Sequence, residues 1–353
     1  MFATGKSLCY FLGMKVFGFL GLIFFVGGCV STPVETRTAT RYEFRQTEMG
    51  VPFRIVVYAY SKNAAEGGAA TAFARIKQIN DIMTDYDSDS ELSRLSLTSG
   101  QDKEVTVSPD LWTVLARAQD LAQRSKGAFD ATVGPYVNLW RYARRQGTLP
   151  DAARLAKARA SVGYTKVQLN PQRHSVKLLA PDMRLDLGGI AKGYAVDQAL
   201  RTLVRVGITN ALVQGGGDIG VSGPPPNKAG WHIEMPPLDA TNAPQARYIT
   251  VSHAGVSTSG DLFQRLELNG IRYSHIIDPR TGFGLTDHRL VTVVAPDDFT
   301  ADGLTKVMSV LPPKEALKFI SKTPGAVVRI VRKPGTNVPV EVYQSRGFRS
   351  VAR

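Results

Sequence analysis

Strand-like and helix-like segments alternate irregularly along this chain, and this alternation constrains its fold most strongly. β-rich runs predict strands at 53–60, 166–169, 175–179, 184–187, 211–214, 231–235, 248–252, 264–268, 291–295 and 326–331. Apolar residues at helical spacing and capping residues predict helices at 64–84, 108–125, 151–160, 190–206, 300–311 and 314–321. Hairpins are frequent and no repeat is present. The pattern favours an α+β fold with one large mixed-sheet domain over a doubly wound sheet.

The first 28 residues have the composition of a cleaved secretory signal. Two lysines are the only charges, and an apolar run at 16–26 is followed by two glycines. That run is too short to span a bilayer comfortably, which favours a signal peptide over the alternative, an uncleaved anchor helix. The segment from Met14 is a complete signal by itself, with Lys15 as its charged region. This leaves residues 1–13 open as an unused upstream start.

Cys29 follows the signal directly. The segment Val26-Gly27-Gly28-Cys29 is similar to the lipobox of bacterial lipoproteins. That resemblance implies cleavage before Cys29, diacylglycerol on its sulfur, and a lipid-anchored protein on the periplasmic side of a bacterial membrane. Val30 replaces the aspartate often linked to inner-membrane retention, which favours the outer membrane, although the choice of membrane stays open.

The rest of the chain must fold without disulfides. Removing residues 1–28 from 353 leaves 325, enough for one large domain or two merged lobes. Residues 29–41 are rich in Ser, Thr and Pro and predict a tether, with the folded domain at 42–353. The second cysteine, Cys9, lies in the signal. The mature chain therefore has no thiol except that of Cys29, which excludes cysteine metal sites and a catalytic cysteine.

Charge narrows the partners. The net charge is +13, two of it in the signal, so the mature chain carries +11. Such a balance is typical of proteins that bind nucleic acid, anionic lipid or an anionic small substrate. Export argues against nucleic acid, and the basic residues are dispersed apart from Arg141, Arg144 and Arg145. A membrane face or a phosphate-bearing ligand is the better interpretation.

Five polar segments, most of them rich in glycine, could bind a ligand; we interpret them as turns or helix starts at 186–197, 214–220, 257–261, 275–282 and 301–305. In the first, bare N–H groups at a helix start and Lys192 predict an anion site, although the Walker spacing is absent. In the second, Asp218 follows three glycines and could bind ribose or a metal. The alternative for each segment is an ordinary structural turn, and for Asp302 a helix cap.

The order of these five segments resembles the FAD:protein FMN transferases, known as the ApbE flavin transferases. Three further segments match: Met49-Gly-x-Pro-Phe53, Tyr86 with Asp89-Ser90-Glu91-Leu92-Ser93, and Gly127 to Pro135 ending in Asn138-Leu-Trp140. The resemblance covers about 42–331. It implies a flavin transferase domain of the ApbE type, with two merged lobes and the FAD site between them.

The resemblance also implies an activity. Members of this family move FMN from FAD to a threonine hydroxyl of a target protein and release AMP. Because this is a phosphoryl transfer, it needs positioning, a divalent cation and charge neutralisation rather than a strong nucleophile. The family suggests acceptors among exported or membrane redox proteins, but the identity of the acceptor and the oligomeric state cannot be inferred from the chain.

Site residues follow from the matching motifs. The resemblance assigns FAD to Met49, Tyr86, Ala128, Phe129, Asp130, Asp186, Lys192 and Ile276, and magnesium to Gly189, Asp302 and Thr305. Lys192 would neutralise diphosphate charge, and Asp186 would hold a hydroxyl group or a ring nitrogen. His275 is the candidate that takes the threonine proton, since imidazole suits proton transfer near neutral pH.

Lys306 departs from the family pattern, which has threonine four residues after the metal-site aspartate. An ammonium group only donates hydrogen bonds, so it cannot ligate a cation. Either Lys306 points away from the site, or its charge partly replaces the metal. Two rival functions also stay open. One is a pyrophosphatase that gives FMN and AMP, with water as acceptor, and the other is a lipid-tethered flavin carrier without enzymatic activity.

Overall fold

Strand β2 (Val51–Ala59) separates two apolar layers. Its alternate residues Phe53, Ile55 and Val57 are fully buried in one core cluster, whereas Val56 belongs to a second cluster. Because successive side chains of a strand point to opposite faces, both faces of the sheet around β2 are covered. The computed structural model describes residues 38–238, 247–260, 265–335 and 338–351.

The central sheet has eight strands, and all its neighbouring strands pair antiparallel. Their order is β1 (Thr40–Glu48), β2, β6 (Ala211–Gly215), β7 (Asp218–Val221), β10 (Ala254–Gly260), β15 (His288–Ala295), β16 (Val327–Lys333) and β17 (Glu341–Gln344).

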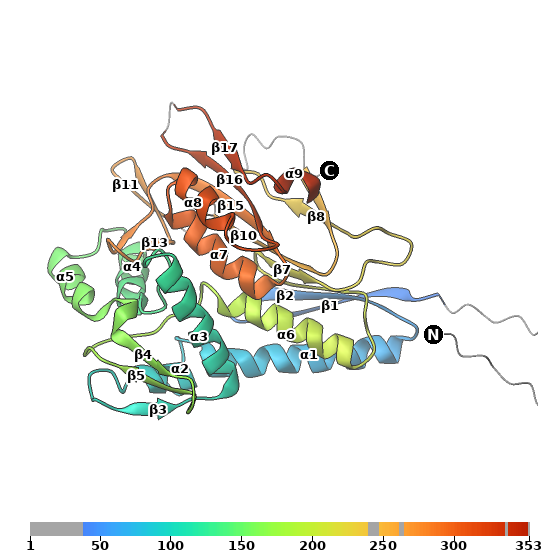
Figure 1. Cartoon of the computed structure of the whole chain (residues 1–353), viewed down its shortest axis with the longest axis horizontal. Coiled ribbons are helices and arrows are strands. Elements are labelled where there is room, and N and C mark those ends of the chain that lie inside the picture. The colour runs from blue at the N-terminus through green and yellow to red at the C-terminus, as the bar shows by residue number, and fades with distance from the viewer. Residues whose placement is uncertain (1–37, 239–246, 261–264, 336–337, 352–353) are drawn as a thin grey trace, which may run out of the picture. The chain divides into compact units, whose positions relative to one another are not determined.

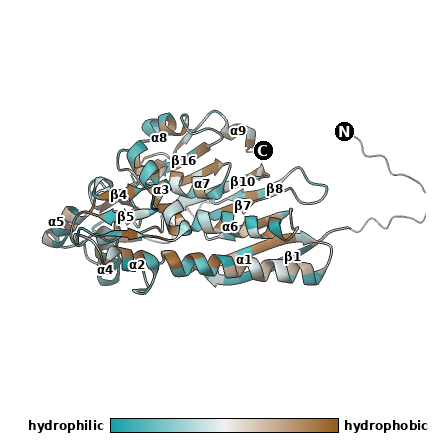
Figure 2. Cartoon of the chain, turned by 60° about the horizontal axis from the view of Figure 1, so that its bottom comes forward, coloured by the Kyte–Doolittle hydropathy of each residue, from teal (hydrophilic) through white to brown (hydrophobic). Residues whose placement is uncertain are grey.

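Helices cover one face of this sheet (Figure 1). They are α1 (Lys62–Met83), α3 (Pro109–Arg124), α6 (Ala191–Arg205) and α7 (Asp298–Val310). In α1 the buried residues recur mostly every three or four positions, as in a helix with one apolar face. Figure 2 shows both hydrophobic and hydrophilic residues on this helix. The second cluster lies on the other face, where the hairpin of β8 (Trp231–Met235) and β9 (Arg247–Val251) and the short helix α9 (Phe348–Val351) pack.

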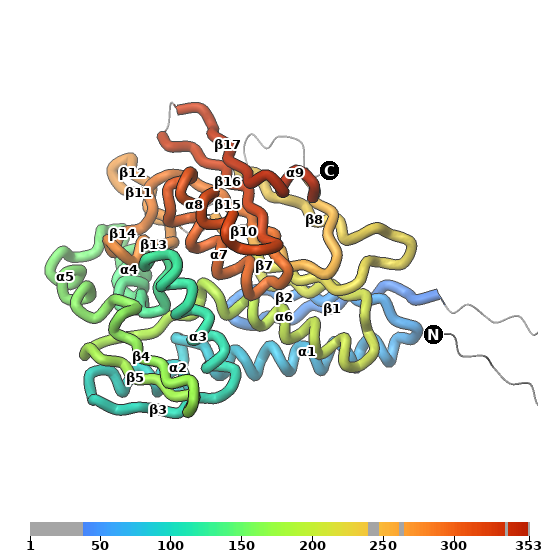
Figure 3. Tube along the Cα trace, in the orientation of Figure 1, coloured from blue at the N-terminus to red at the C-terminus, as the bar shows by residue number. Residues whose placement is uncertain are grey.

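Smaller elements surround this core (Figure 3). A three-stranded sheet has the order β3 (Glu104–Thr106), β5 (Ser175–Leu178) and β4 (Val167–Asn170). Two short hairpins are β11 (Arg265–Leu268) with β12 (Ile271–Ser274), and β13 (Ile277–Asp278) with β14 (Phe283–Gly284). The remaining helices are α2 (Glu91–Ser96), α4 (Gly134–Gln146), α5 (Ala152–Ser161), the 3₁₀ helix η1 (Tyr164–Lys166) and α8 (Pro313–Ile320).

The structure confirms the α+β class, and the described chain from Thr38 onward forms one compact unit. Three local expectations were wrong. The tether ends earlier, because Thr40 and Arg41 already belong to β1, a strand that its many polar residues concealed. The segment 184–187 is not a strand, since the N–H of Leu185 donates to Ser96 Oγ and that of Asp186 to the Ala131 carbonyl. The segment 257–260 lies in strand β10 rather than in a turn.

Several expectations lie outside the described residues. They concern the signal peptide at 1–28, the lipid on Cys29, the tether up to residue 37, and the positions Asp261 and Gln264. Within the described ranges, no helix is both long and apolar enough to cross a membrane.

Asp197 connects α6 to the start of α7. Its carboxylate accepts the N–H groups of Asp298 at 3.0 Å and Phe299 at 2.9 Å. Burial raises the pKa of Asp197 to about 6 despite these two bonds. The native state therefore binds more protons than the unfolded state between the ordinary value of 3.8 and about 6. The stability that protonated Asp197 contributes is thus full below that window and is lost as pH rises through it.

We expect Asp197→Asn to remove this pH dependence. Relative to the variant, the wild type should lose about 2–3 kcal/mol of unfolding free energy between pH 4 and pH 7. Asparagine keeps one acceptor oxygen, so the lost second bond adds only an offset that does not change with pH. Urea unfolding at a series of pH values measures the difference, with the exposed Asp81→Asn as control. Parallel curves for wild type and Asp197→Asn would contradict the prediction.

Candidate FAD site

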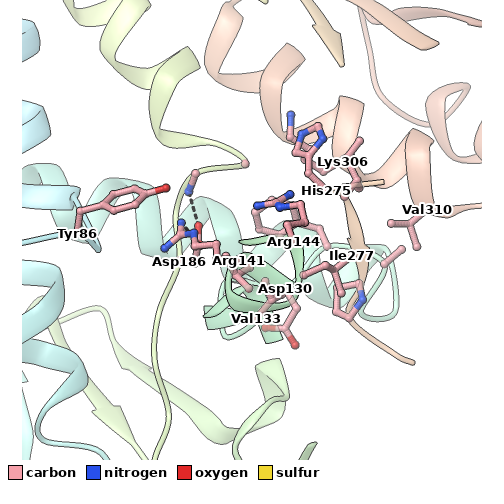
Figure 4. A pocket seen from close by; sticks show the side chains of 17 residues that line it. Tyr86, Asp130, Val133, Arg141, Arg144, Asp186, His275, Ile277, Lys306 and Val310 are labelled. Atoms are coloured by element: carbon pink, nitrogen blue, oxygen red, sulfur yellow. Dashed lines mark hydrogen bonds and ion pairs between the residues drawn. The ribbon is translucent and has the colours of Figure 1, made fainter. Parts of the chain in front are cut away.

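A cavity of about 240 Å³ lies where several loops meet α4 and α7. Tyr86 comes from the segment after α1, Ala128 to Asp130 from the turn before α4, and Asp186 to Gly189 from the turn before α6. His275 and Ile276 come from the connection between β12 and β13, Ile277 from the start of β13, and Lys306 from α7. Figure 4 shows Tyr86 on the opposite side of the view from His275 and Lys306.

The cavity combines an apolar surface with a stacked cation. Ala128, Phe129 and Ile276 are buried members of the main core and give the lining its apolar part. Tyr86 is 80% exposed, and the guanidinium carbon of Arg141 lies 4.3 Å from the centre of its ring. An apolar wall with an aromatic ring at its mouth suits a large planar ligand.

Asp186 is held in a charged network. Its Oδ1 accepts the Gly188 N–H at 2.8 Å, and its Oδ2 lies 3.5 Å from Arg141, which also pairs with Asp85 at 2.5 Å. Burial, and then the negative charge of Asp85, raise the pKa of Asp186 above its ordinary value. A carboxyl group that takes up a proton more readily can donate as well as accept, which suits contact with a hydroxyl group or a ring nitrogen.

Asp130 shapes the turn before α4. It accepts hydrogen bonds from the N–H and hydroxyl groups of Thr132, at 2.8 and 2.7 Å, and from the N–H of Tyr164 at 2.8 Å. Burial raises its pKa although these bonds oppose the shift. All three bonds are internal, so this carboxylate fixes the turn that presents Ala128 and Phe129 to the cavity.

Lys306 contacts the two side chains expected to bind magnesium. Its Nζ lies 3.0 Å from Asp302 Oδ1 and 3.0 Å from Thr305 Oγ1, and its side chain packs against Gly189. Thr305 donates its hydroxyl proton to the Asp302 carbonyl at 2.7 Å. Lys306 therefore does not point away, and that alternative was wrong.

The oxygen atoms of Asp302 and Thr305 contact ammonium groups, and these surroundings suit an ammonium group better than a magnesium ion. Asp302 is fully buried, and Lys192 adds a second ammonium group 3.7 Å from its Oδ2. Although burial raises it, Lys192 and Lys306 hold the pKa of Asp302 below its ordinary value. A cation bound here would meet two positive charges at close range. In the part of the chain that the structure describes, no group of three or more His, Cys, Asp or Glu side chains is placed to hold a metal.

Comparison with known proteins identifies the family. Residues 49–330 match the model of the ApbE family. The chain belongs to the ApbE family. The FAD:protein FMN transferase of Haemophilus influenzae is 36% identical over 266 residues, which cover 73% of this chain and 77% of that protein. The enzyme of the same name from Klebsiella pneumoniae is 32% identical over 324 residues, covering 89% and 91%.

Solved structures agree with this assignment. The flavin transferase ApbE from Vibrio cholerae has a TM-score of 0.78 at 28% identity, covering 89% of this chain and 99% of that one. The ApbE protein from Thermotoga maritima has a TM-score of 0.77 at 29% identity, covering 89% and 100%. The family and the fold expected from the sequence are therefore confirmed.

Lys192 of this ApbE-family chain pairs with buried carboxylates instead of lining the cavity. Its Nζ is 2.7 Å from Asp218, whose other oxygen accepts the Ser257 hydroxyl at 2.6 Å, and neither Lys192 nor Asp218 is part of the lining. Burial alone would lower the pKa of Lys192, but Asp218 and Asp302 raise it above its ordinary value. At the start of α6, the Gly193 N–H donates to Asp302 at 3.1 Å. A carboxylate of the protein itself thus fills part of the expected anion site.

Other expected residues also stand outside the lining. Met49 lies in the β1–β2 turn and packs against the main core. Asp302 and Thr305 do not line the cavity themselves, but both contact Lys306, which does. Asp297, not Asp302, caps α7, so the helix-cap alternative for Asp302 was wrong.

Arg141 and Arg144 were not expected in the site, yet both line it with Val133 and Val137. The sequence held a signal for this placement. Spacings of four, four and three residues put these side chains on one face of a helix, but α4 itself was not predicted.

Proposed function

We propose that this chain is an enzyme that transfers FMN from FAD to a threonine hydroxyl of an exported or membrane-associated redox protein and releases AMP. One observation carries the proposal: residues that the resemblance assigns to FAD surround a single cavity together with His275 and Lys306. The names of the relatives, which specify FMN transfer to protein, support it. The residues in question are Tyr86, Ala128, Phe129, Asp130, Asp186 and Ile276.

In the proposed reaction, the acceptor oxygen attacks the phosphorus that carries riboflavin. A bond from this phosphorus to the acceptor oxygen forms, and its bond to the bridging oxygen of the diphosphate breaks. The electron pair leaves with AMP, and the hydroxyl proton passes to the imidazole of His275. The cavity wall supplies position and charge, which is what phosphoryl transfer requires.

Lys306 supplies positive charge beside the reacting diphosphate in this proposal. Asp302 and Thr305 hold its ammonium group, and the Lys192 ammonium group lies 3.7 Å from the other carboxylate oxygen of Asp302. Fixed charges of this kind stabilise developing negative charge in a transition state without reorganisation. No step is assigned to magnesium, because an ammonium group occupies the donors expected for it.

We also propose that lipid on Cys29 holds the enzyme on the periplasmic side of a bacterial membrane. The lipobox-like segment and the Ser/Thr/Pro-rich tether support this placement. Cys29→Ala should release the protein into the soluble fraction while the specific activity of the purified domain stays within about twofold, since the lipid is proposed to contribute membrane affinity alone. Retention of the variant in washed membranes would contradict the lipid anchor.

Mass spectrometry and nucleotide analysis separate the three candidate functions. The purified protein is incubated with FAD and a redox subunit that carries a candidate acceptor threonine. Gain of an FMN mass on that threonine, together with AMP release, supports transfer. Release of FMN and AMP without a modified acceptor supports the pyrophosphatase. Tight FAD binding without any AMP, over a panel of acceptors, supports the carrier.

A further inference from the structure

The charged side chains of the cavity lining differ in how they are paired. Asp130, Asp186 and Lys306 each make hydrogen bonds within the protein, and Arg141 pairs with Asp85 and Asp186. Arg144 is the exception within the part of the chain that the structure describes. Its guanidinium group forms no hydrogen bond and no ion pair there, and Arg141, a charged residue that acts on it, is of like sign. The charged residues of the lining, besides His275, are Asp130, Arg141, Arg144, Asp186 and Lys306.

The helix explains where Arg144 stands but not which way it turns. Arg144 and Arg145 both lie in the last turn of α4, where positive charge interacts favourably with the helix dipole. Arg145 is exposed to solvent, whereas Arg144 is half-buried and lines the cavity. Figure 4 draws Arg144 between His275 and Arg141. The dipole acts equally on both residues, so it does not account for the orientation of Arg144 into the cavity.

The unpaired guanidinium group of Arg144 is partly desolvated in the empty protein. Burial, and then the charge of Arg141, lower the pKa of Arg144, yet a guanidinium group stays protonated in proteins. An anion that enters the cavity would supply the hydrogen-bond acceptors and the opposite charge that this group lacks within the protein. Lys192 does not take this part, because it is not part of the cavity lining and its ammonium group pairs with Asp218 at 2.7 Å.

We propose that Arg144, which lies in the cavity wall and carries a positive charge, binds the negatively charged diphosphate of FAD. The inference rests on the proposed function, and it adds a residue outside the set that the family resemblance assigns. The diphosphate is the only part of FAD with formal negative charge, since the flavin and adenine rings are neutral. The planar fork of a guanidinium group offers two parallel N–H donors to two phosphate oxygens, a fixed geometry that an ammonium group lacks.

The test compares three ligands with three variants. Arg144→Gln removes the charge, Arg144→Lys keeps the charge without the fork, and Arg145→Gln is the matched control on the same helix turn. FAD and ADP both contain a diphosphate, whereas riboflavin contains none. Flavin fluorescence measures FAD and riboflavin binding, calorimetry measures ADP binding, and thermal unfolding reports whether each variant is folded.

We expect Arg144→Gln to weaken the binding of FAD and of ADP by about tenfold or more, as for loss of a charge-assisted hydrogen bond. Riboflavin binding should change by less than about twofold, because it contributes no phosphate contact. Arg144→Lys should lie between wild type and Arg144→Gln, and Arg145→Gln should match wild type. The FAD affinity of wild type should fall with added salt more steeply than that of Arg144→Gln.

Two results would overturn the assignment of Arg144. One is unchanged FAD and ADP affinity in Arg144→Gln, and the other is equal weakening of riboflavin and FAD, which would assign Arg144 to the flavin ring. Both leave the proposed function intact. Failure of the wild-type protein to bind FAD is a different result, and it would contradict the function itself.

Discussion

Replacing Lys306 with threonine should make the proposed FMN transfer dependent on magnesium, which we expect the wild type not to require. In the wild type, the Lys306 ammonium group lies 3.0 Å from both Asp302 Oδ1 and Thr305 Oγ1. The variant removes this charge and frees both oxygens, and it adds a hydroxyl group as a third oxygen donor one helical turn after Asp302. Hard divalent cations prefer such oxygen donors.

The measurement is FMN transfer as a function of magnesium concentration, in chelator-treated protein. Without metal, Lys306→Thr should lose about 10²-fold to 10³-fold in kcat, the usual cost of removing one fixed charge from a transition state. Millimolar magnesium should restore most of this loss. Wild type should change by less than about threefold over the same range, since its ammonium group repels a second cation.

Two further variants sharpen the Lys306 test. Lys306→Met removes the charge without adding an oxygen, so magnesium should rescue it poorly. Lys318→Thr, at an exposed position on α8, makes the same change as Lys306→Thr far from the cavity lining and should behave like wild type. If wild-type activity rises steeply with millimolar magnesium and disappears with a chelator, the substitution of metal by Lys306 is wrong.

Replacing His275 with alanine should give the other large loss of activity. His275 lines the cavity beside Lys306 and is the only histidine among the described residues of that lining. General-base catalysis typically contributes about 10²-fold to 10⁴-fold, so kcat should fall by that factor at neutral pH. The KM for FAD should change by less than about threefold, because the base acts on the acceptor hydroxyl rather than on the bound flavin.

The pH profile separates a base from a structural role. In the wild type, kcat should fall toward acid pH as the imidazole takes up a proton, and this limb should be missing from His275→Ala. Added imidazole should restore part of the activity to the variant. His232→Ala, an exposed position on β8, is the matched control. Retention of full activity by His275→Ala, or loss of activity with an unchanged pH profile, would assign the proton to another group.

Most elements of the fold could be predicted from local pattern. The strand at Trp231–Met235 and the helix capped by Ser108 were predicted within a residue of their observed bounds, because side-chain alternation and caps act over a few residues. Strand β1 was missed, since nearly all its residues are exposed or half-buried and its polarity resembles that of a tether. The segment at 184–187 has a strand-like composition, but its backbone bonds to a side chain at the end of α2 and to the turn before α4 instead of to a strand.

The sequence by itself determined the family, the fold class and the separation of four residues between Asp302 and Lys306. On a helix that separation places two side chains within reach of each other, although the sequence left open whether Lys306 points away from the site. Only the tertiary structure decided how the remaining charges pair. Lys192 on α6 pairs with Asp218 on β7, and Arg141 on α4 pairs with Asp85 in the segment after α1. Arg144 is left facing the cavity. These pairings depend on loop closure and packing over tens of residues, which no local pattern specifies.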